Sequence, residues 1–310
     1  MDPVTHVLVG ITIANFSGSS SSWLNPATVA SIVGSLLPDA DIVFQLGGDV
    51  LYLKHHRGFS HSLVGLSLLS VSAGLFLHQA YNFTPIHVLL LWTFLGCLSH
   101  LVIDVLNSYG AQILWPFKRR KFSCGLLTLF DPVITGLLLG GLWGSWLSVR
   151  SVSGLVLGYV GFRVVMREMV RTALKQAYAP GAKIAVFPSQ LGLLCWDFII
   201  ETAEEQIVGY CRWLPRHWET RRRLKRQNEN QVINLAKQTK LGQMFCSFSP
   251  FVHVFYTQSE DKHIVNFLDL RYFLKNDFMH SATVVFDASL ELLDSILHPY
   301  HKNRQVRITD

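Results

Sequence analysis

The sequence predicts two domains: a membrane domain that is all-α, with about four to five transmembrane helices plus a short first helix, and a small cytoplasmic α+β domain with an antiparallel sheet. Half of the 310 residues are hydrophobic and only 15% are charged, whereas soluble chains average roughly 25% charged residues. The pattern also changes near residue 179, because long apolar runs precede it and short alternating segments follow it. We therefore expect the domains to cover residues 1–179 and 180–310.

Long apolar runs predict the helices of the first domain. The longer ones approach the ~20 residues that a helix needs to cross the hydrocarbon core. They cover residues 27–46, 62–78, 86–106, 132–149 and 153 to about 165. The run at residues 7–16 is too short to cross alone, and we expect it to form a half-inserted helix.

Basic residues in the loops predict the orientation. Lys54 and Arg57 lie in one loop and "FKRRKF" (117–122) in another, while the linkers near residues 16–26 and 81–85 carry no basic residue. By the positive-inside rule, the two basic loops face the cytoplasm. The last helix then ends on the same side. The sequence thus predicts a multi-pass protein of the cell (inner) membrane whose C-terminal domain lies in the cytoplasm.

Short β-branched and aromatic runs between polar turns predict the sheet of the second domain. They cover residues 182–188, 195–202, 205–214, 251–258, 263–273 and 282–288. A charged helix is expected at about 218–239. Its basic part, "RHWETRRRLKR" (216–226), favours a solvated or membrane-apposed face over nucleic-acid binding. The expected partners are the lipid bilayer, anionic phospholipid headgroups and a cytoplasmic protein, with nucleic acid disfavoured.

The five cysteines form no CxxC motif, which argues against a zinc ribbon or a disulfide framework. Reduced thiols facing the cytosol are the simpler interpretation. Cys195 and Cys211 could still face each other across a hairpin, so a disulfide between them stays open.

Ionisable residues collect at one end of the predicted bundle. The topology, derived from loop charge alone, brings them to the cytoplasmic face. They are His6, Asp39, Asp41, His55, His56, Arg57, His61, His100 and Asp104. Such residues are costly inside a membrane and usually serve a function. A structural polar network between helices is the alternative.

The spacing of these residues suits a metal site. His100 and Asp104 are four residues apart, so they share one helix face and can bind one ion. His56 and His61 flank a glycine, which permits a tight turn that brings both imidazoles together. The two aspartates of "LLPDAD" follow a proline, which loosens the helix locally.

Imidazoles mixed with carboxylates favour zinc, with manganese and iron as alternatives, over calcium and magnesium, which prefer oxygen ligands only. The number of ligands is enough for two or more ions. A pair of metal ions is a familiar device for in-line displacement at phosphorus, with a bound water whose pKa falls toward ~7.

Four motifs are characteristic of a known family: "MDPVTH", "LLPDAD", "HHRGFSHS" and "SHLVIDVLNSYG". Because of these motifs, the first third of the chain resembles the YdjM/YfhP-type family of inner-membrane proteins described as predicted metal-dependent hydrolases. The second half, with "LDLRYF", is similar to the longer branch of that family. The family is distantly similar to the helical fold of zinc-dependent phospholipase C and related nucleases. Ser60 stands where we expect threonine, and it keeps the hydroxyl.

The resemblance implies a set of metal ligands. They are His6, Asp39, His56, His61, His100 and Asp104. It also implies that Asp41 and His55 either support these ligands or replace one of them.

The leading hypothesis is a metal-dependent hydrolase that cleaves a phosphoester or related ester on a lipid or membrane-proximal substrate. The catalytic candidates are Asp39, Asp41, Arg57 and His55. A metal-activated water would attack, Arg57 would steady the anionic group, and an aspartate would accept the proton. The main alternative is a non-catalytic, membrane-anchored regulatory or scaffolding protein whose cytoplasmic domain binds a partner protein. A transporter is disfavoured, because transporters bind near the bilayer midplane.

Overall fold

The structure, a computed structural model, divides the chain into two compact units. It describes residues 1–18, 24–48, 51–52, 56–118, 120–143, 148–178, 180–213, 217–259, 261–274, 276–299 and 304–308. The first unit comprises residues 1–46 and 55–166. The second unit runs from Arg167 onward and includes a short segment that begins at Gly47.

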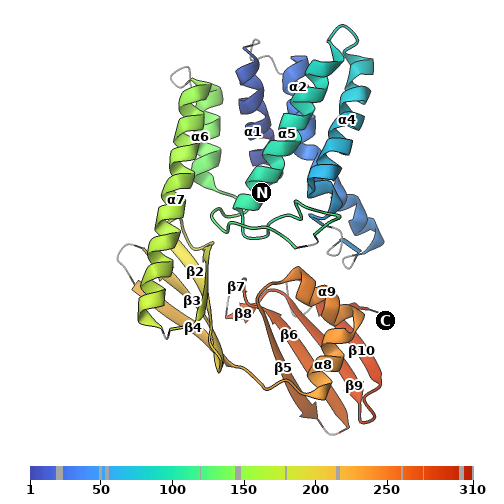
Figure 1. Cartoon of the computed structure of the whole chain (residues 1–310), viewed down its shortest axis with the longest axis vertical. Helices are drawn as coiled ribbons and strands as arrows, with labels where there is room; N and C mark the ends of the chain where they lie inside the picture. The colour runs from blue at the N-terminus through green and yellow to red at the C-terminus, as the bar shows by residue number, and fades with distance from the viewer. Residues whose placement is uncertain are drawn as a thin grey trace. The chain divides into compact units, whose positions relative to one another are not determined.

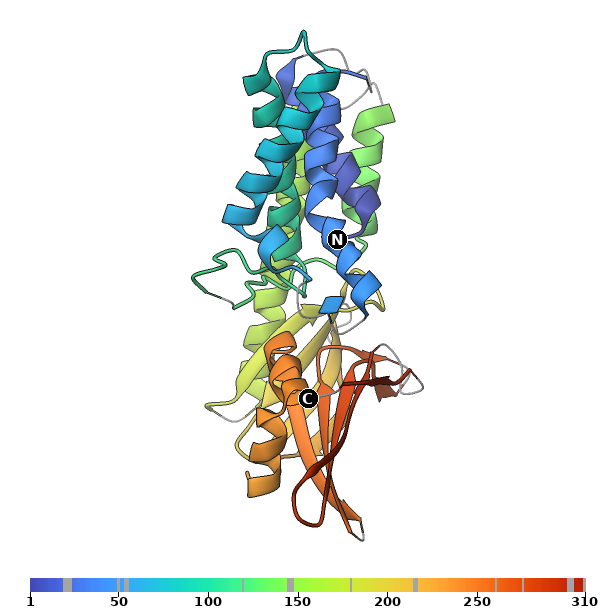
Figure 2. The same ribbon diagram turned by 90° about the vertical axis from the view of Figure 1, so that its right-hand side faces the viewer.

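Helices build the first unit (Figures 1 and 2). They are α1 (Pro3–Ala14), α2 (Pro26–Leu36), α4 (Leu63–Ala80), α5 (Ile86–Leu106), α6 (Pro132–Trp143) and α7 (Val149–Ala177), which continues into the second unit. A 3-10 segment, η2 (Leu37–Gly47), extends α2, and a short one, η3 (Phe59–His61), precedes α4.

Four helical segments among the described residues are long and apolar enough to cross a membrane. They are Pro26–Gly47, Leu63–Ala80, Ile86–Leu106 and Val149–Ala177. The short first helix is also as predicted, since α1 has 12 residues. Of the span expected at 132–149, the structure describes helix α6, which has 12 residues and ends at Trp143, while residues 144–147 lie outside the described residues. The run expected at 153–165 is part of the longer helix α7.

Prolines define where two of these helices begin and where one changes. Pro3 and Pro26 occupy the first turns of α1 and α2, where a missing N–H costs nothing. The side chain of Asn25 caps α2 by accepting from the Ala27 N–H. Pro38 has no N–H to donate, and the α-helix gives way to the 3-10 segment η2 at Leu37.

Glycines let α2 and α5 pack closely, because a Cβ at either of two positions would collide with the other helix. At Gly34 it would meet the Thr93 carbonyl, and at Gly96 it would meet the Ser31 carbonyl. Small residues at such contacts are typical of helix packing in membranes. The contact fixes the position of His100, one turn beyond Gly96 on α5.

Two larger antiparallel sheets and two helices, besides the end of α7, build the described part of the second unit. The first sheet has the order β1 (Lys183–Pro188), β2 (Cys195–Glu201), β3 (Glu205–Arg212) and β4 (His217–Lys225). The second has the order β11 (Val306–Arg307), β10 (Leu292–His298), β9 (Ser281–Asp287), β6 (Lys262–Asp269) and β5 (Val252–Ser259). A small hairpin pairs β7 (Phe273–Leu274) with β8 (Asp277–Phe278).

Helices α8 (Gln231–Gln238) and α9 (Lys240–Phe248) cover one face of the second sheet. Their core residues include Ile233 and Phe245, which pack with Val265, Phe267 and Val284 of the sheet. A second cluster of apolar side chains, including Ile199 and Leu268, joins the first sheet to the other face of the second sheet.

The six predicted strands are confirmed as β1, β2, β3, β5, β6 and β9. The helix expected at 218–239 is wrong in its first half, which forms β4. Its basic side chains find partners across the strands: Arg223 donates to Glu205 over 2.9 Å and Arg226 to Glu201 over 3.4 Å. The helix begins only at α8, where the side chain of Asn230 caps it. The strand β4 is therefore polar and lies at the edge of the sheet, so a search for alternating apolar residues does not detect it.

None of the five cysteines, all of which the structure describes, forms a disulfide. In the β2–β3 register Cys195 lies opposite Arg212, and Cys211 lies opposite Trp196. The two cysteines are therefore offset by one residue and point to opposite faces of the sheet. The structure thus answers the disulfide question left open by the sequence.

We predict that Gly96→Ala lowers the free energy of unfolding by about 1–3 kcal/mol, because the added methyl overpacks the contact between α2 and α5. Chemical unfolding in detergent micelles measures this. The control is Gly158→Ala on α7, where a Cβ meets nothing within 4 Å. The control should unfold like the wild type or slightly later. Equal stability of the two variants would contradict the close packing.

Asp197 on β2 gives a pH-dependent prediction. Burial raises the pKa of Asp197 to about 6. The folded state therefore binds this proton more tightly than the unfolded chain, and stability falls as the pH rises from about 4 through about 6. Asp197→Asn should raise the free energy of unfolding by about 1–3 kcal/mol above pH 7, and by much less near pH 4. Asp261→Asn, at an exposed turn, is the control. A gain in the free energy of unfolding that does not depend on pH would contradict the raised pKa of Asp197.

Candidate metal centre

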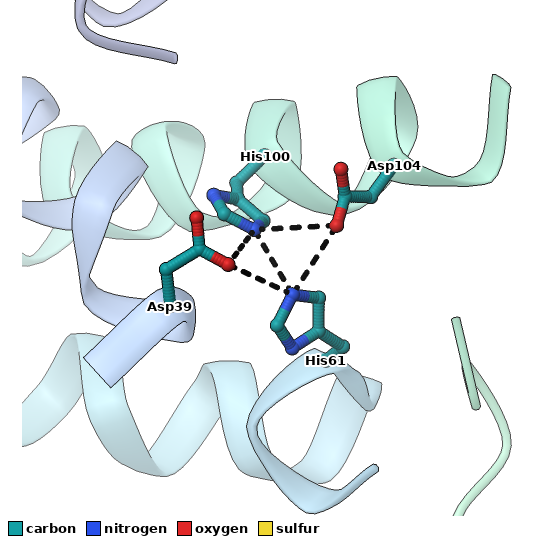
Figure 3. Close-up of side chains that lie close together, drawn as sticks. All are labelled: Asp39, His61, His100 and Asp104. Carbon is teal, nitrogen blue, oxygen red and sulfur yellow. Dashed lines mark hydrogen bonds and ion pairs between the residues drawn. The ribbon is translucent and has the colours of Figure 1, made fainter. Parts of the chain in front are cut away.

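Four side chains from three segments bring one ligand atom each to a common centre (Figure 3). Asp39 comes from η2, His61 ends η3, and His100 and Asp104 lie on α5. The four atoms all lie within 4.8 Å of one another. The side chains of His61, His100 and Asp104 are fully buried, whereas that of Asp39 is 27% exposed. The centre therefore opens to its surroundings on the side of Asp39.

The spacing of these atoms matches a metal coordination shell. The two Nε2 atoms of His61 and His100 are 3.0 Å apart. The distances from these nitrogens to the nearest carboxylate oxygens of Asp39 and Asp104 run from 3.3 to 3.6 Å. With metal–ligand bonds of about 2.0–2.2 Å, neighbouring ligands of a tetrahedral or octahedral ion are about 3.0–3.5 Å apart. The four residues could therefore hold one metal ion.

Hydrogen bonds fix the tautomers of both imidazoles. His100 Nδ1 lies 2.7 Å from the Ser35 carbonyl oxygen, which can only accept. The Ser60 hydroxyl donates to Asp41 over 3.2 Å, so its oxygen accepts from His61 Nδ1 at 2.9 Å. Both Nδ1 atoms thus carry a proton, and in the neutral form of each ring the Nε2 atom turns a lone pair toward the centre.

Two facing lone pairs at 3.0 Å repel each other unless a cation lies between them. A single proton would relieve the repulsion between only one pair of the four ligand atoms. Two nitrogens and two carboxylate oxygens around one point favour a multivalent cation. Asp104 Oδ2, one of the four ligand atoms, is buried and accepts no hydrogen bond from the described residues, although the Arg57 guanidinium lies 3.1 Å away. The donor set therefore fits a metal ion.

Asp41 organises the loop that carries His61. It accepts from the Arg57 N–H over 2.9 Å and from the Ser60 hydroxyl, and it lies 3.1 Å from His56 Nδ1. The loop includes Arg57 at φ +60, a left-handed conformation that is rare for this residue type. The hydrogen bond to Asp41 helps to hold this strained backbone in place.

His56 forms a pair with Asp41 and does not join the four ligands. Its ring centroid lies 6.2 Å from that of His61. Burial lowers the pKa of His56 below its ordinary value, with Asp41 opposing this effect. The imidazole is therefore neutral at pH 7, with Nδ1–H donating to Asp41.

Arg57 is buried beside Asp104. Its side chain donates to Asn107 over 3.0 Å and lies 3.1 Å from Asp104 Oδ2. Asn107 in turn donates to the other oxygen of Asp104 over 3.1 Å. The guanidinium is thus held by two neighbours, which leaves its buried Nε without a hydrogen bond among the described residues.

His6 lies on the far side of Asp104. Its ring stacks on that of His100 with centroids 3.8 Å apart, and its Nε2 is 3.6 Å from Asp104 Oδ1. The Met1 amino group contacts both His6 Nε2 and Asp104 Oδ1. Asp104 thus turns one oxygen to the four-residue centre and the other to His6.

Of the residues implied as ligands, the structure brings Asp39, His61, His100 and Asp104 together. His6 adjoins this group, and His56 lies beside it. Asp41 takes a supporting position, and His55 lies outside the described residues. Asn107 was missed, although it stands three residues after Asp104 within a motif that the sequence had already singled out. The Ser35 carbonyl has no sequence signal, because a backbone oxygen can belong to any residue.

Residues 1–170 match the family model of the YdjM inner membrane protein, and residues 231–308 match that of the YfhP C-terminal alpha/beta plait domain. A curated relative, the uncharacterized protein YfhP of Bacillus subtilis (strain 168), is 28% identical to this chain. The alignment covers 95% of this chain and 94% of that relative. No solved structure matches the chain.

We predict that purified protein loaded with zinc retains about one ion per chain at the four-residue centre. His61→Ala and Asp104→Asn should each lose most of it, because each removes one of four ligands. Elemental analysis after gel filtration measures the ratio. His87→Ala, at an exposed position near the start of α5, is the control and should keep the ion. Retention of zinc by both ligand variants would contradict the site.

Proposed function

The chain belongs to the YdjM inner membrane protein family, and we propose that it is a membrane-bound hydrolase that uses the four-residue centre to cleave a phosphoester or related ester. The observation that carries the proposal is the convergence of two imidazole nitrogens and two carboxylates, all of which are atoms that bind metal ions. A purely structural network of neutral imidazoles and carboxylates would leave these four atoms without matched donors.

Asp39, His61, His100 and Asp104 would hold a divalent transition metal. Zinc fits this mixture of nitrogen and oxygen ligands best, with manganese and iron as alternatives. When bound, the ion supplies Lewis acidity, which lowers the pKa of a water molecule and polarises a phosphoryl oxygen. A second ion would bind His6 Nε2 and Asp104 Oδ1 in place of the Met1 amino group, which contacts both atoms.

His56 and Asp41 form a histidine–carboxylate pair at the edge of the centre. The imidazole is neutral at pH 7, and its side chain is 23% exposed. Asp41 fixes the ring through Nδ1, which leaves Nε2 as the proton-accepting atom. We assign this pair the general base and acid function. The sequence had implied a ligand role for His56, and the proposal replaces that role with proton transfer.

Arg57 would steady the anionic group of the substrate. Its guanidinium lies against Asp104 and Asn107, and the planar donor suits phosphate. Asp39 is the most exposed of the four ligands, so the substrate would approach from its side.

An amphiphilic substrate fits the surroundings of Asp41. Ile42, Val43 and Leu46 follow it in η2 and are 60%, 57% and 90% exposed. Apolar side chains so exposed at the end of a candidate membrane span suit contact with lipid tails or a membrane surface. They support a lipid or another membrane-proximal ester as the substrate.

We also propose that the centre and the second unit face the cytoplasm, next to anionic headgroups. The support is the charge of the loops: Arg57, Lys118 and Lys121 lie in two of them, and no basic residue lies at 81–85.

We predict that His56→Gln lowers kcat by about 100-fold or more, because the proton acceptor is lost. Bound zinc should stay at the wild-type level, since His56 is not among the four ligands. The assay uses zinc-loaded protein in mixed micelles with bis(p-nitrophenyl) phosphate and a set of fluorogenic phospholipids. His87→Gln is the matched control and should keep full activity.

Two results would contradict the proposal. Zinc-loaded wild type that hydrolyses none of these substrates would point to a structural metal site in a scaffolding protein. Activity that survives Asp39→Asn and His61→Ala would show that it arises elsewhere in the chain or in a contaminant.

A further inference from the structure

A pocket of about 400 Å³ lies in the second unit, on the face of the second sheet that α8 and α9 do not cover. This volume falls within the range of small-molecule sites, about 300–1,000 Å³. Strands β5, β6, β9 and β10 form its floor, while β4 and the β7–β8 hairpin form its walls. All of these elements belong to the second unit, so the pocket is separate from the metal centre.

The strand register gives the floor an apolar side and a polar side. Phe255, Asn266 and Thr283 lie in one row across β5, β6 and β9. The next row contains Leu268 on β6 and Ser281 on β9, followed by a histidine on β10. A flat ring lying on this floor would meet Phe255 and Leu268 on one side and polar groups on the other.

Hydrogen bonds align the polar side. The Thr283 hydroxyl donates to Asn266 Oδ1 over 3.0 Å, and its oxygen lies 3.4 Å from His298 Nε2. Asn266 Nδ2 has no partner among the described residues and lines the pocket. An amide nitrogen fixed in this way offers its donors to a ring nitrogen or carbonyl.

The walls add aromatic surface and one cation. Phe273 and Phe278 are buried in an edge-to-face pair with centroids 4.8 Å apart. Arg222 lines the pocket from β4 and has no ion-pair partner among the described residues. Its neighbours are paired, Arg221 with Asp197 at 3.8 Å and Arg223 with Glu205 at 2.9 Å. One of three consecutive arginines is therefore left for an anion.

Asp277 lines the wall formed by the hairpin, and one of its oxygens accepts from the Phe278 N–H over 2.9 Å. A carboxylate in the same pocket as an arginine disfavours a purely anionic ligand. It suits a ligand that carries hydroxyl donors as well as a negative group.

We propose that this pocket binds a nucleotide. The base lies on the floor against Phe255, with its edge at Asn266 and Thr283. The ribose hydroxyls donate to Asp277, and the phosphate pairs with Arg222. The second unit is then a ligand-binding domain in a chain whose other unit carries the metal centre.

The test measures binding of AMP, GMP, adenosine and ribose 5-phosphate to the full chain in detergent by titration calorimetry. Arg222→Gln should weaken AMP or GMP binding about tenfold or more and leave adenosine unchanged, because only the phosphate contact is lost. Thr283→Val should weaken the nucleotide and adenosine alike. Arg223→Gln, the same change on the next residue of β4, is the control and should bind like the wild type.

Three outcomes would overturn the proposal. The first is no binding of either nucleotide at millimolar concentration to a folded wild type. The second is binding that Arg222→Gln and Thr283→Val leave unchanged, which would place the nucleotide at another site. The third is ribose 5-phosphate binding as tightly as AMP, which would show a phosphate site with no contribution from the base.

Discussion

The burial of the Asp104 carboxylate is the constraint on which the first unit depends. A fully buried carboxylate in an apolar bundle is strongly destabilising unless cations and donors surround it. Arg57 and Asn107 supply part of that compensation. His6 from α1 and His61 from the loop before α4 face the same carboxylate. Two segments distant in sequence are therefore drawn to one turn of α5, and the metal centre forms at that junction.

Preorganisation of the ligands follows from short, local hydrogen bonds. The Ser35 carbonyl and the Ser60 hydroxyl each hold one imidazole by its Nδ1 proton, so both Nε2 atoms are turned inward before any ion binds. The Ser60 hydroxyl also links His61 to Asp41. This contact explains why position 60 holds a residue with a hydroxyl group. The left-handed backbone of Arg57 belongs to the same arrangement, because Asp41 accepts its N–H.

Much of the fold could be predicted from the sequence, because the length of an apolar run predicts a membrane span and the alternation of apolar and polar residues predicts a strand. The β4 strand could not be recognised, because it is held by backbone pairing with β3 and its own side chains are mostly charged or polar, without an alternating apolar pattern. At the site, the spacing of four residues made the pairing of His100 with Asp104 predictable. Which of His56 and His61 is a metal ligand could not be predicted. The answer depends on how the turn around Gly58 directs each ring and on which ring Asp41 engages.

The most direct test of the metal centre is X-ray absorption spectroscopy of the zinc-loaded protein, which reports the atoms bound to the metal. The four-residue centre predicts a shell of nitrogen and oxygen at about 2.0–2.2 Å. It also predicts the outer-shell signal of two imidazoles, reduced to one in His61→Ala, and no sulfur. A sulfur shell near 2.3 Å, or a shell of oxygen without imidazole, would mean that the ion binds elsewhere and would contradict the centre formed by Asp39, His61, His100 and Asp104.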